Sequence, residues 1–281
     1  MLPATRRAGS AMIDKTVPTL ADAVAGIADG STVLVGGFAT SGVPLALIDA
    51  LLAQGARDLT IVSNHAGNGD TGLAALLAAG RVRRIVCSFP RHRDSWVFDG
   101  LYKAGRIELE LVPQGTMAER LRAAGAGIGA FYTPTAYGTD LASGKETRVI
   151  DGRAHVLEYP LHGDVALVCA DRGDRWGNLV YRKTARNFGP IMCTAADTTI
   201  AQVREMVELG GIDPEVVVTP GVFVDRVVVV PDPEQEAAMV KEGASTWAKR
   251  TKIEPEETAA MPRNRANRGG KAGRSLMKWL P

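Results

Sequence analysis

The sequence has 281 residues, of which 46% are hydrophobic and 23% are charged, a composition that is ordinary for a globular protein. Its formal net charge of +2 is too small to indicate a nucleic-acid-binding protein. No apolar run approaches the ~20 residues that a membrane-spanning helix needs, so we expect no membrane partner.

Residues 1–12 contain two arginines but no apolar segment typical of a secretory signal, and we expect them to be an N-terminal extension. Strand-like and helix-like segments then alternate. Pro44 suits the first turn of a helix and Gly55 suits the position just after its end. The apolar patterns predict strands over residues 32–35, 59–62, 84–87 and 109–112, and helices over 44–54, 72–79 and 96–103.

The strand-like runs lack polar alternation, which indicates strands covered on both faces and therefore a largely parallel sheet. Short strands separated by helices of about ten residues are typical of repeated βαβ units. We therefore predict one open, doubly wound α/β domain over residues 13–230, with a mostly parallel sheet and helices on both faces. Its later strands are expected near residues 155–158, 165–170, 198–203 and 226–230.

The composition changes after residue 230. Pro231-Asp232-Pro233 interrupts the pattern, and residues 258–281 contain six basic residues and no acidic one. We predict a basic, disordered tail over residues 231–281 without a specific role.

A glycine-rich segment directly follows the first predicted strand and opens a helix. Paired glycines let the backbone approach a ligand that any Cβ would exclude, and free N–H groups at a helix start favour an anionic ligand. A tight strand-to-helix turn without a ligand is the alternative. The candidate binding residues are Gly36, Gly37, Phe38, Ala39, Thr40, Ser41 and Gly42.

Gln114 follows the predicted strand at 109–112. Thr116 and Glu119 have the spacing of a capping box, so we expect Gln114 to lie between the end of a strand and the start of a helix. Ligands of open α/β sheets bind at that edge, and a glutamine amide there can stabilise a developing oxyanion. The alternative is a loop glutamine bonded to the backbone.

Three further features carry less information. Residues 125–130 fit a dinucleotide-binding pattern but follow a helix instead of a strand, so we expect a glycine-lined loop near a ligand and no nicotinamide. Residues 63–69 form a loop at the same sheet edge, in which His65 has no identifiable partner.

Cys87, Cys169 and Cys193 form no CxxC pair, so we expect buried, reduced thiols in a cytoplasmic protein, without a metal site.

Together these motifs resemble the A-subunit half of the family I CoA-transferases. The resemblance covers residues 13–230. The matching stretches are Asp29-Gly30, Gly36-Gly37-Phe38 with Gly42-Val43-Pro44, Val112-Pro113-Gln114-Gly115-Thr116, Ala118-Glu119-Arg120, residues 125–131, Thr133-Pro134-Thr135, Trp176-Gly177-Asn178 and Ala185-Arg186-Asn187-Phe188.

The resemblance implies a function and a partner. In that family a glutamate of a Ser-Glu-Asn-Gly motif in the B half attacks an acyl-CoA thioester, in ping-pong covalent catalysis. That motif does not occur in these 281 residues, so we expect the glutamate on a B subunit, in a heterodimer or heterotetramer. By resemblance, residues 36–42 bind CoA, which is a substrate and not a permanently bound cofactor, and Gln114 stabilises the oxyanion.

Residues 87–91 and 181–192 look most like the branch of the family that moves CoA from succinyl-CoA to 3-oxoadipate. In the 63–69 loop, His65 stands at a position where we expect an asparagine in that branch. We predict that Arg91 fixes the distal carboxylate of the dicarboxylate substrate, because guanidinium binds carboxylate through two parallel bonds. A surface arginine is the alternative. The rival functions are acetoacetate as acceptor and, in another class, a non-catalytic ligand-sensing domain.

Overall fold

A computed structural model describes residues 13–92 and 94–230. The predicted N-terminal extension at 1–12 and the predicted tail at 231–281 lie outside these residues. None of the helices in the described parts of the chain is long and apolar enough to cross a membrane.

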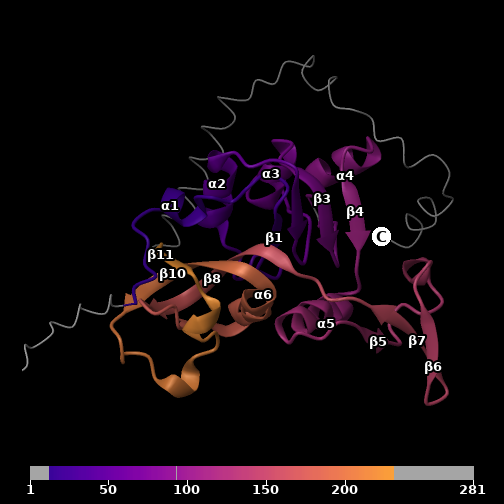
Figure 1. Ribbon diagram of the computed structural model, residues 1–281. Helices are drawn as coiled ribbons and strands as arrows, with labels where there is room; N and C mark the ends of the chain where they lie inside the picture. Colours follow the sequence, from indigo (N-terminus) through magenta and orange to yellow (C-terminus); the bar gives the residue numbers. More distant parts are fainter. Residues whose placement is uncertain (1–12, 93, 231–281) are drawn as a thin grey trace, which may run out of the picture.

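The body of the protein is an eight-stranded sheet (Figure 1). The strands run in the order β11-β10-β8-β1-β2-β3-β4, all neighbours parallel, and only the short β9 pairs antiparallel, with β8. The chain therefore winds outward from β1 in one direction and from β8 in the other, which confirms the predicted doubly wound sheet. The strands are β1 Thr32–Val35, β2 Leu59–Val62, β3 Val82–Cys87, β4 Glu108–Leu111, β8 Gly163–Asp174, β9 Leu179–Val180, β10 Ala196–Val207 and β11 Arg226–Val229.

Helices cover both faces of this sheet, as predicted (Figure 1). Alternate residues of a strand point to opposite faces, so Val33 and Val35 pack under α1 to α4 while Leu34 packs against α5 and α6. Every strand at the centre therefore needs apolar residues at successive positions. The helices are α1 Leu20–Val24, α2 Leu45–Gln54, α3 Leu73–Ala78, α4 Trp96–Lys103, α5 Gln114–Gly125 and α6 Gly189–Ala195, and the 3-10 turns are η1 Asp140–Ala142, η2 Lys183–Arg186, η3 Pro214–Val216 and η4 Gly221–Phe223.

A second, three-stranded antiparallel sheet projects beside α5, in the order β5-β7-β6 (Figure 1). Its strands are β5 Phe131–Thr133, β6 Thr147–Ile150 and β7 Arg153–Glu158. The prediction that residues 155–158 belong to the main sheet is wrong. Asp151 and Gly152 both have positive φ, 49° and 75°, and this Asp-Gly pair forms the two-residue hairpin turn that joins β6 to β7.

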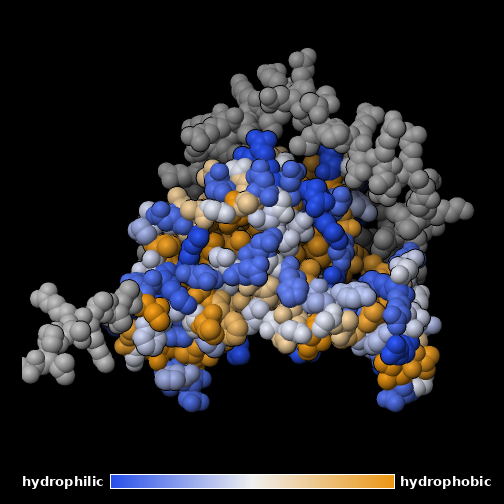
Figure 2. All heavy atoms as spheres, in the orientation of Figure 1, coloured by the Kyte–Doolittle hydropathy of each residue, from blue (hydrophilic) through white to orange (hydrophobic). Residues whose placement is uncertain are grey.

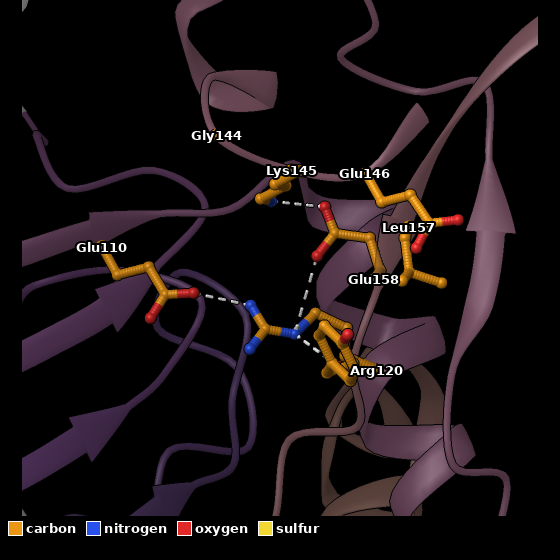
Figure 3. A pocket seen from close by; sticks show the side chains of 8 residues that line it. Glu110, Arg120, Gly144, Lys145, Glu146, Leu157 and Glu158 are labelled. Atoms are coloured by element: carbon orange, nitrogen blue, oxygen red, sulfur yellow. Dashed lines mark hydrogen bonds and ion pairs between the residues drawn. The ribbon is translucent and has the colours of Figure 1, made fainter. Parts of the chain in front are cut away.

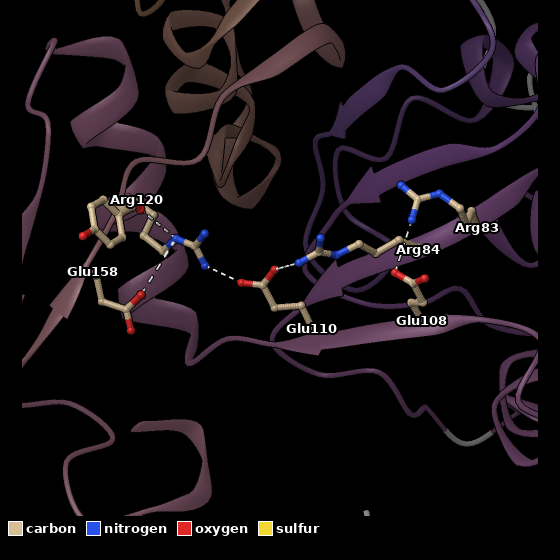
Figure 4. A network of polar contacts seen from close by, with 7 residues as sticks. Arg83, Arg84, Glu108, Glu110, Arg120 and Glu158 are labelled. Carbon is tan, nitrogen blue, oxygen red and sulfur yellow. Dashed lines mark hydrogen bonds and ion pairs between the residues drawn. The ribbon is translucent and has the colours of Figure 1, made fainter. Parts of the chain in front are cut away.

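A chain of ion pairs connects the two sheets through α5 (Figure 4). Glu110 on β4 pairs with Arg84 on β3 and, at 2.6 Å, with Arg120 on α5. Arg120 lies 4.0 Å from the buried Glu158 of β7, which Lys145 contacts at 2.6 Å. Burial alone would raise the pKa of Glu110, but the hydrogen bond and charge of Arg120, together with Arg84, hold that pKa below its ordinary value.

A cavity of about 400 Å³ lies between β4, α5 and β7, and both acidic and basic side chains line it (Figure 3). Among the described residues, its cations Arg120 and Lys145 are both engaged by carboxylates. The cavity therefore offers no unpaired cation to an anionic ligand, and we assign it a structural role.

Hydrophobic side chains also reach the surface. Figure 2 shows them gathered along the lower margin of one face, over the antiparallel sheet and over the turns that precede β11, whereas the middle of that face is largely hydrophilic. The exposed residues in these two segments include Val149 on β6 and Val216, Val222 and Phe223 near η3 and η4.

Candidate active site

Four loops meet at the carboxyl edge of the main sheet, because β1, β2, β3 and β4 are parallel neighbours in the order of the chain. The first of these loops, after β1, lies where the winding direction reverses between β1 and β8. In open α/β sheets a crevice at that point is where ligands bind. The fold therefore brings the glycine-rich segment, the 63–69 loop, Arg91 and Gln114 to one edge.

The glycine-rich segment is a compact turn in which Phe38 and Ser41 exchange two backbone hydrogen bonds of 3.0 and 2.9 Å. A Cβ on Gly37 would lie 2.6 Å from Cγ2 of Val43, and one on Gly42 would lie 2.7 Å from the carbonyl oxygen of Ala185. Both glycines also have positive φ. Close packing within the chain therefore requires glycine at positions 37 and 42, and this packing explains why the motif has glycine there.

The η2 turn and the residue after it hold this segment from one side. The Asn187 amide accepts from the N–H of Gly37 at 3.1 Å and donates to the carbonyl oxygen of Ser41 at 3.0 Å. The hydroxyls of Ser41 and Thr184 lie 2.9 Å apart. Asn187 belongs to a stretch that carries the family resemblance, yet its contact with Gly37 spans 150 residues and no local pattern indicates it.

These contacts narrow the predicted role of the loop. The N–H groups of Gly36, Gly37, Phe38 and Ser41 all donate within the chain, and the buried Gln202 of β10 accepts from the N–H of Leu47 in the first turn of α2. The N–H of Leu47 is therefore already bonded within the chain, and binding of an anionic ligand at the start of α2 stays a prediction. What remains available to a ligand is the exposed tip of the loop, residues 38–40.

His65 holds the same loop from the other side. Its Nδ1 accepts from the N–H of Gly67 at 2.9 Å, so the proton is on Nε2, which donates to the carbonyl oxygen of Ala39 at 3.0 Å. Burial, and then the neighbouring His92, lower the pKa of His65. The ring is therefore neutral at physiological pH and acts as a tether, with a partner that the sequence did not identify.

Gln114 is the first residue of α5 and its side chain is exposed. Its Nε2 donates to Oδ1 of Asn64 at 2.6 Å. Asn64 is only 4% exposed, and its Oδ1 also accepts from the hydroxyl of Ser88 at 2.9 Å. The alternative of a glutamine bonded to the backbone is thus wrong, and Asn64 is a site residue that the sequence interpretation missed.

The predicted capping box at the start of α5 is also wrong. Pro113 is the N-cap, and Met117 donates its N–H to the Pro113 carbonyl oxygen at 2.9 Å. Thr116 is buried inside the first turn, with no hydrogen-bond partner for its hydroxyl among the described residues, and Glu119 pairs with Arg122 instead. The helix starts earlier than predicted because proline already has a φ compatible with helix entry, −53° here.

Arg91 lies in the loop after β3, and its Nε contacts Oδ1 of Asp99 on α4 at 2.7 Å. Its side chain is partly exposed. Since only Nε is used in this ion pair, the two Nη groups of the guanidinium remain as donors.

Residues 125–130 lie at the other end of α5, about 16 Å along the helix axis from Gln114. A Cβ on Gly125 would lie 2.3 Å from Oγ1 of Thr194 on α6. This glycine therefore serves the contact between two helices, whereas a Cβ on Gly127 or Gly129 would meet open space, and a ligand-lining role for this loop stays a prediction.

The arrangement has a clear chemical capacity. It presents a neutral amide donor on an exposed side chain, at the same sheet edge as a glycine-rich loop that Asn187 and His65 hold on two sides. Neutral donors that are fixed in advance stabilise the oxyanion of an acyl-transfer transition state.

Comparisons with known proteins agree with this chemistry. Residues 17–230 match the coenzyme A transferase family. The chain is 68% identical over 219 residues to the A subunit of the 3-oxoadipate CoA-transferase of Pseudomonas putida, covering 78% of this chain and 95% of that protein. It is 60% identical over 227 residues to the protein of the same name from Acinetobacter baylyi, covering 81% of this chain and all of that protein.

A third relative, the A subunit of the succinyl-CoA:3-ketoacid coenzyme A transferase of Xanthomonas campestris, is 51% identical and covers 79% of this chain and 92% of that protein. Among solved structures, the glutaconate coenzyme A-transferase of Acidaminococcus fermentans shares the fold, with a TM-score of 0.68 at 22% identity over 84% of this chain and 88% of that one. Since the family match spans the whole described sheet and the relatives align over nearly their full length, the chain belongs to the coenzyme A transferase family.

Proposed function

We propose that this chain is the A subunit of a cytoplasmic CoA-transferase that moves CoA from succinyl-CoA to 3-oxoadipate. The observation that carries the proposal is the exposed amide of Gln114, which Asn64 holds at the same carboxyl edge of the sheet as the glycine-rich loop. The acceptor is inferred from the relatives named for 3-oxoadipate, at 68% and 60% identity.

The reaction proceeds through two covalent exchanges. A glutamate carboxylate attacks the thioester carbonyl of succinyl-CoA, and the C–S bond breaks to give a mixed anhydride and the CoA thiolate. The thiolate then attacks the glutamyl carbonyl, which releases succinate and leaves a glutamyl–CoA thioester. The same two steps run in reverse with 3-oxoadipate. Each step passes through an oxyanion, to which the Gln114 amide donates.

The attacking glutamate comes from a B subunit, within a Ser-Glu-Asn-Gly motif, in a heterodimer or heterotetramer. Two features support a partner at this edge. The relatives are named as A subunits. Phe38 and Phe89, on the loops after β1 and β3, and Trp96, at the start of α4, are about half exposed, as expected for aromatic residues that a partner covers.

The exposed loop tip, residues 38–40, contacts CoA, which enters and leaves as part of the substrates. Its fixed position supports this role, because a preformed loop loses little conformational entropy when a ligand binds.

The test is a kinetic comparison of the complex with the B subunit. Gln114→Ala should lower kcat by about 10²- to 10³-fold. The control is Gln54→Ala, which removes an amide with two hydrogen bonds at the far end of α2 and should leave kcat unchanged. A full rate from this chain purified alone would refute the need for a partner. Unchanged kcat in the Gln114→Ala complex would refute the oxyanion role.

We further propose that the Nη groups of Arg91 bind the distal carboxylate of 3-oxoadipate. Arg91→Ala should raise KM for 3-oxoadipate by about tenfold or more and leave KM for acetoacetate, which has no second carboxylate, unchanged. Arg122→Ala, a surface substitution on α5, is the control. Equal effects on both acceptors would refute this role. A complex that prefers acetoacetate would instead favour the succinyl-CoA:3-ketoacid activity for which the relative at 51% identity is named.

A further inference from the structure

Asn64 accepts hydrogen bonds at both its backbone carbonyl and its side-chain amide. It follows β2 by two positions and is almost completely buried. Its backbone carbonyl oxygen accepts from the N–H groups of Ser88 and Phe89 at 3.3 and 3.0 Å, which ties it to the loop after β3. Its side-chain Oδ1 accepts from Ser88 and from Gln114. Both the backbone and the amide of Asn64 are therefore fixed before any substrate binds.

The side chain of Gln114 has the opposite character. It is exposed and has three rotatable bonds, and the two ends of its amide have nearly the same shape but opposite polarity. An unrestrained glutamine would present either its NH2 group or its carbonyl oxygen to a reacting group. Only the NH2 group stabilises an oxyanion, whereas the carbonyl oxygen would repel it.

We propose that Asn64 is a positioning residue that selects the productive orientation of the Gln114 amide. Because Oδ1 of Asn64 is a hydrogen-bond acceptor, it accepts only from the NH2 end of Gln114. One N–H is used in that bond, which leaves the second N–H of the same nitrogen as the donor for an oxyanion. The inference rests on the proposed oxyanion role of Gln114 and adds the residue that sets its direction.

A double-mutant cycle in the complex with the B subunit tests this role. The variants are Asn64→Leu, which keeps the size of the side chain without an acceptor, Gln114→Ala, and both together. Asn64→Leu should lower kcat by about tenfold or more while KM for succinyl-CoA changes by less than about twofold. In the Gln114→Ala background the same substitution should have almost no further effect, because the group that it positions is already absent.

Stability and assembly are measured for each variant by urea unfolding and by co-purification with the B subunit. Asn64→Ala replaces Asn64→Leu if the larger side chain prevents folding. Gln54→Ala is the matched amide control and should leave kcat unchanged in both backgrounds. Equal losses of kcat with and without Gln114, or a loss of stability with unchanged kcat, would overturn the inference while leaving the role of Gln114 intact. Unchanged kcat in Gln114→Ala alone would overturn both.

Discussion

His65 donates its Nε2–H to the carbonyl oxygen of Ala39 at 3.0 Å, and Ala39 has a φ of 51°, a left-handed conformation that residues other than glycine rarely adopt. The bond therefore stabilises the exposed tip of the glycine-rich loop, to which Ala39 belongs. The Nδ1 atom of the same ring accepts from the N–H of Gly67, and because only an unprotonated nitrogen can accept, the two bonds together require the neutral form of histidine.

The stability of the fold should therefore depend on the protonation of His65. Burial holds its pKa below the ordinary value of 6.5. Above that pH the ring is neutral in both the folded and the unfolded state; below it, the unfolded chain takes up a proton that the folded chain does not, so stability falls as the pH falls. Between about pH 7.5 and about pH 5.5, the wild type should lose more unfolding free energy than His65→Gln, by up to about 1.4 kcal/mol, because the pH falls about one unit below 6.5. Urea titrations at several pH values check this, and parallel curves for the two proteins would contradict it.

Gly42 and Gly80 allow a matched test of the glycine-rich loop. Their φ angles are 68° and 64°, but a Cβ on Gly80 would meet open space whereas one on Gly42 would lie 2.7 Å from the Ala185 carbonyl oxygen. Gly80→Ala should cost only the left-handed strain, about 1 kcal/mol, and leave KM for succinyl-CoA unchanged. Gly42→Ala should displace the loop from η2 and raise that KM by about tenfold or more. Equal KM values for the two variants would argue against CoA binding by this loop.

The cysteines should be unreactive in the folded protein. Burial raises the pKa of Cys87 to about 12 and that of Cys193 to about 11, and Cys169 is also buried. Because the thiolate is the reactive form, a thiol reagent at neutral pH should modify the native chain very slowly and modify all three thiols after unfolding in urea. Mass spectrometry after a short exposure measures this. Fast modification of one cysteine without denaturant would show an opening of the sheet that its burial does not predict.

Arg120 should contribute much more to stability than Arg122, two residues further along α5. The side chain of Arg120 is 12% exposed and joins Glu110 to the segment after β7, whereas that of Arg122 is 53% exposed. Arg120→Ala leaves the partly buried Glu110 with Arg84 as its remaining cation and removes a charged hydrogen bond, which should cost about 2 kcal/mol. Arg122→Ala should cost less than about 1 kcal/mol. Urea unfolding of both variants makes the comparison, and similar losses would mean that the ion-pair chain does not support the junction of the two sheets.

The main sheet could be predicted from sequence because its determinants are local. Short apolar runs identified β1 to β3, and the leucines of the edge strand β4 indicated a strand although glutamates alternate with them. Pro44 and Gly55 placed the ends of α2, where Gly55 has the left-handed φ of 101° and donates to the carbonyl oxygen of Leu51. The wrong predictions involve choices between two local patterns. The Asp151-Gly152 turn makes a separate hairpin of a strand that its apolar pattern assigns to the main sheet, and Pro113 begins α5 before the apparent capping box.

The contacts that build the site join residues that are far apart in the sequence. Gln114 and Asn64 are 50 residues apart, and Gly37 and Asn187 are 150 apart. Each pair meets only because strands far apart in the sequence end at the same edge, so composition and spacing placed Gln114 and the glycine loop at that edge without identifying what holds them.

Asn64 and His65 are consecutive, yet one contacts Gln114 and the other contacts Ala39. The dipeptide that follows β2 thus anchors both Gln114, the proposed oxyanion donor, and the tip of the glycine-rich loop. If that strand end shifted, Gln114 and the loop tip would shift with it. The distance between them would therefore be preserved even when this edge of the sheet moves relative to a B subunit.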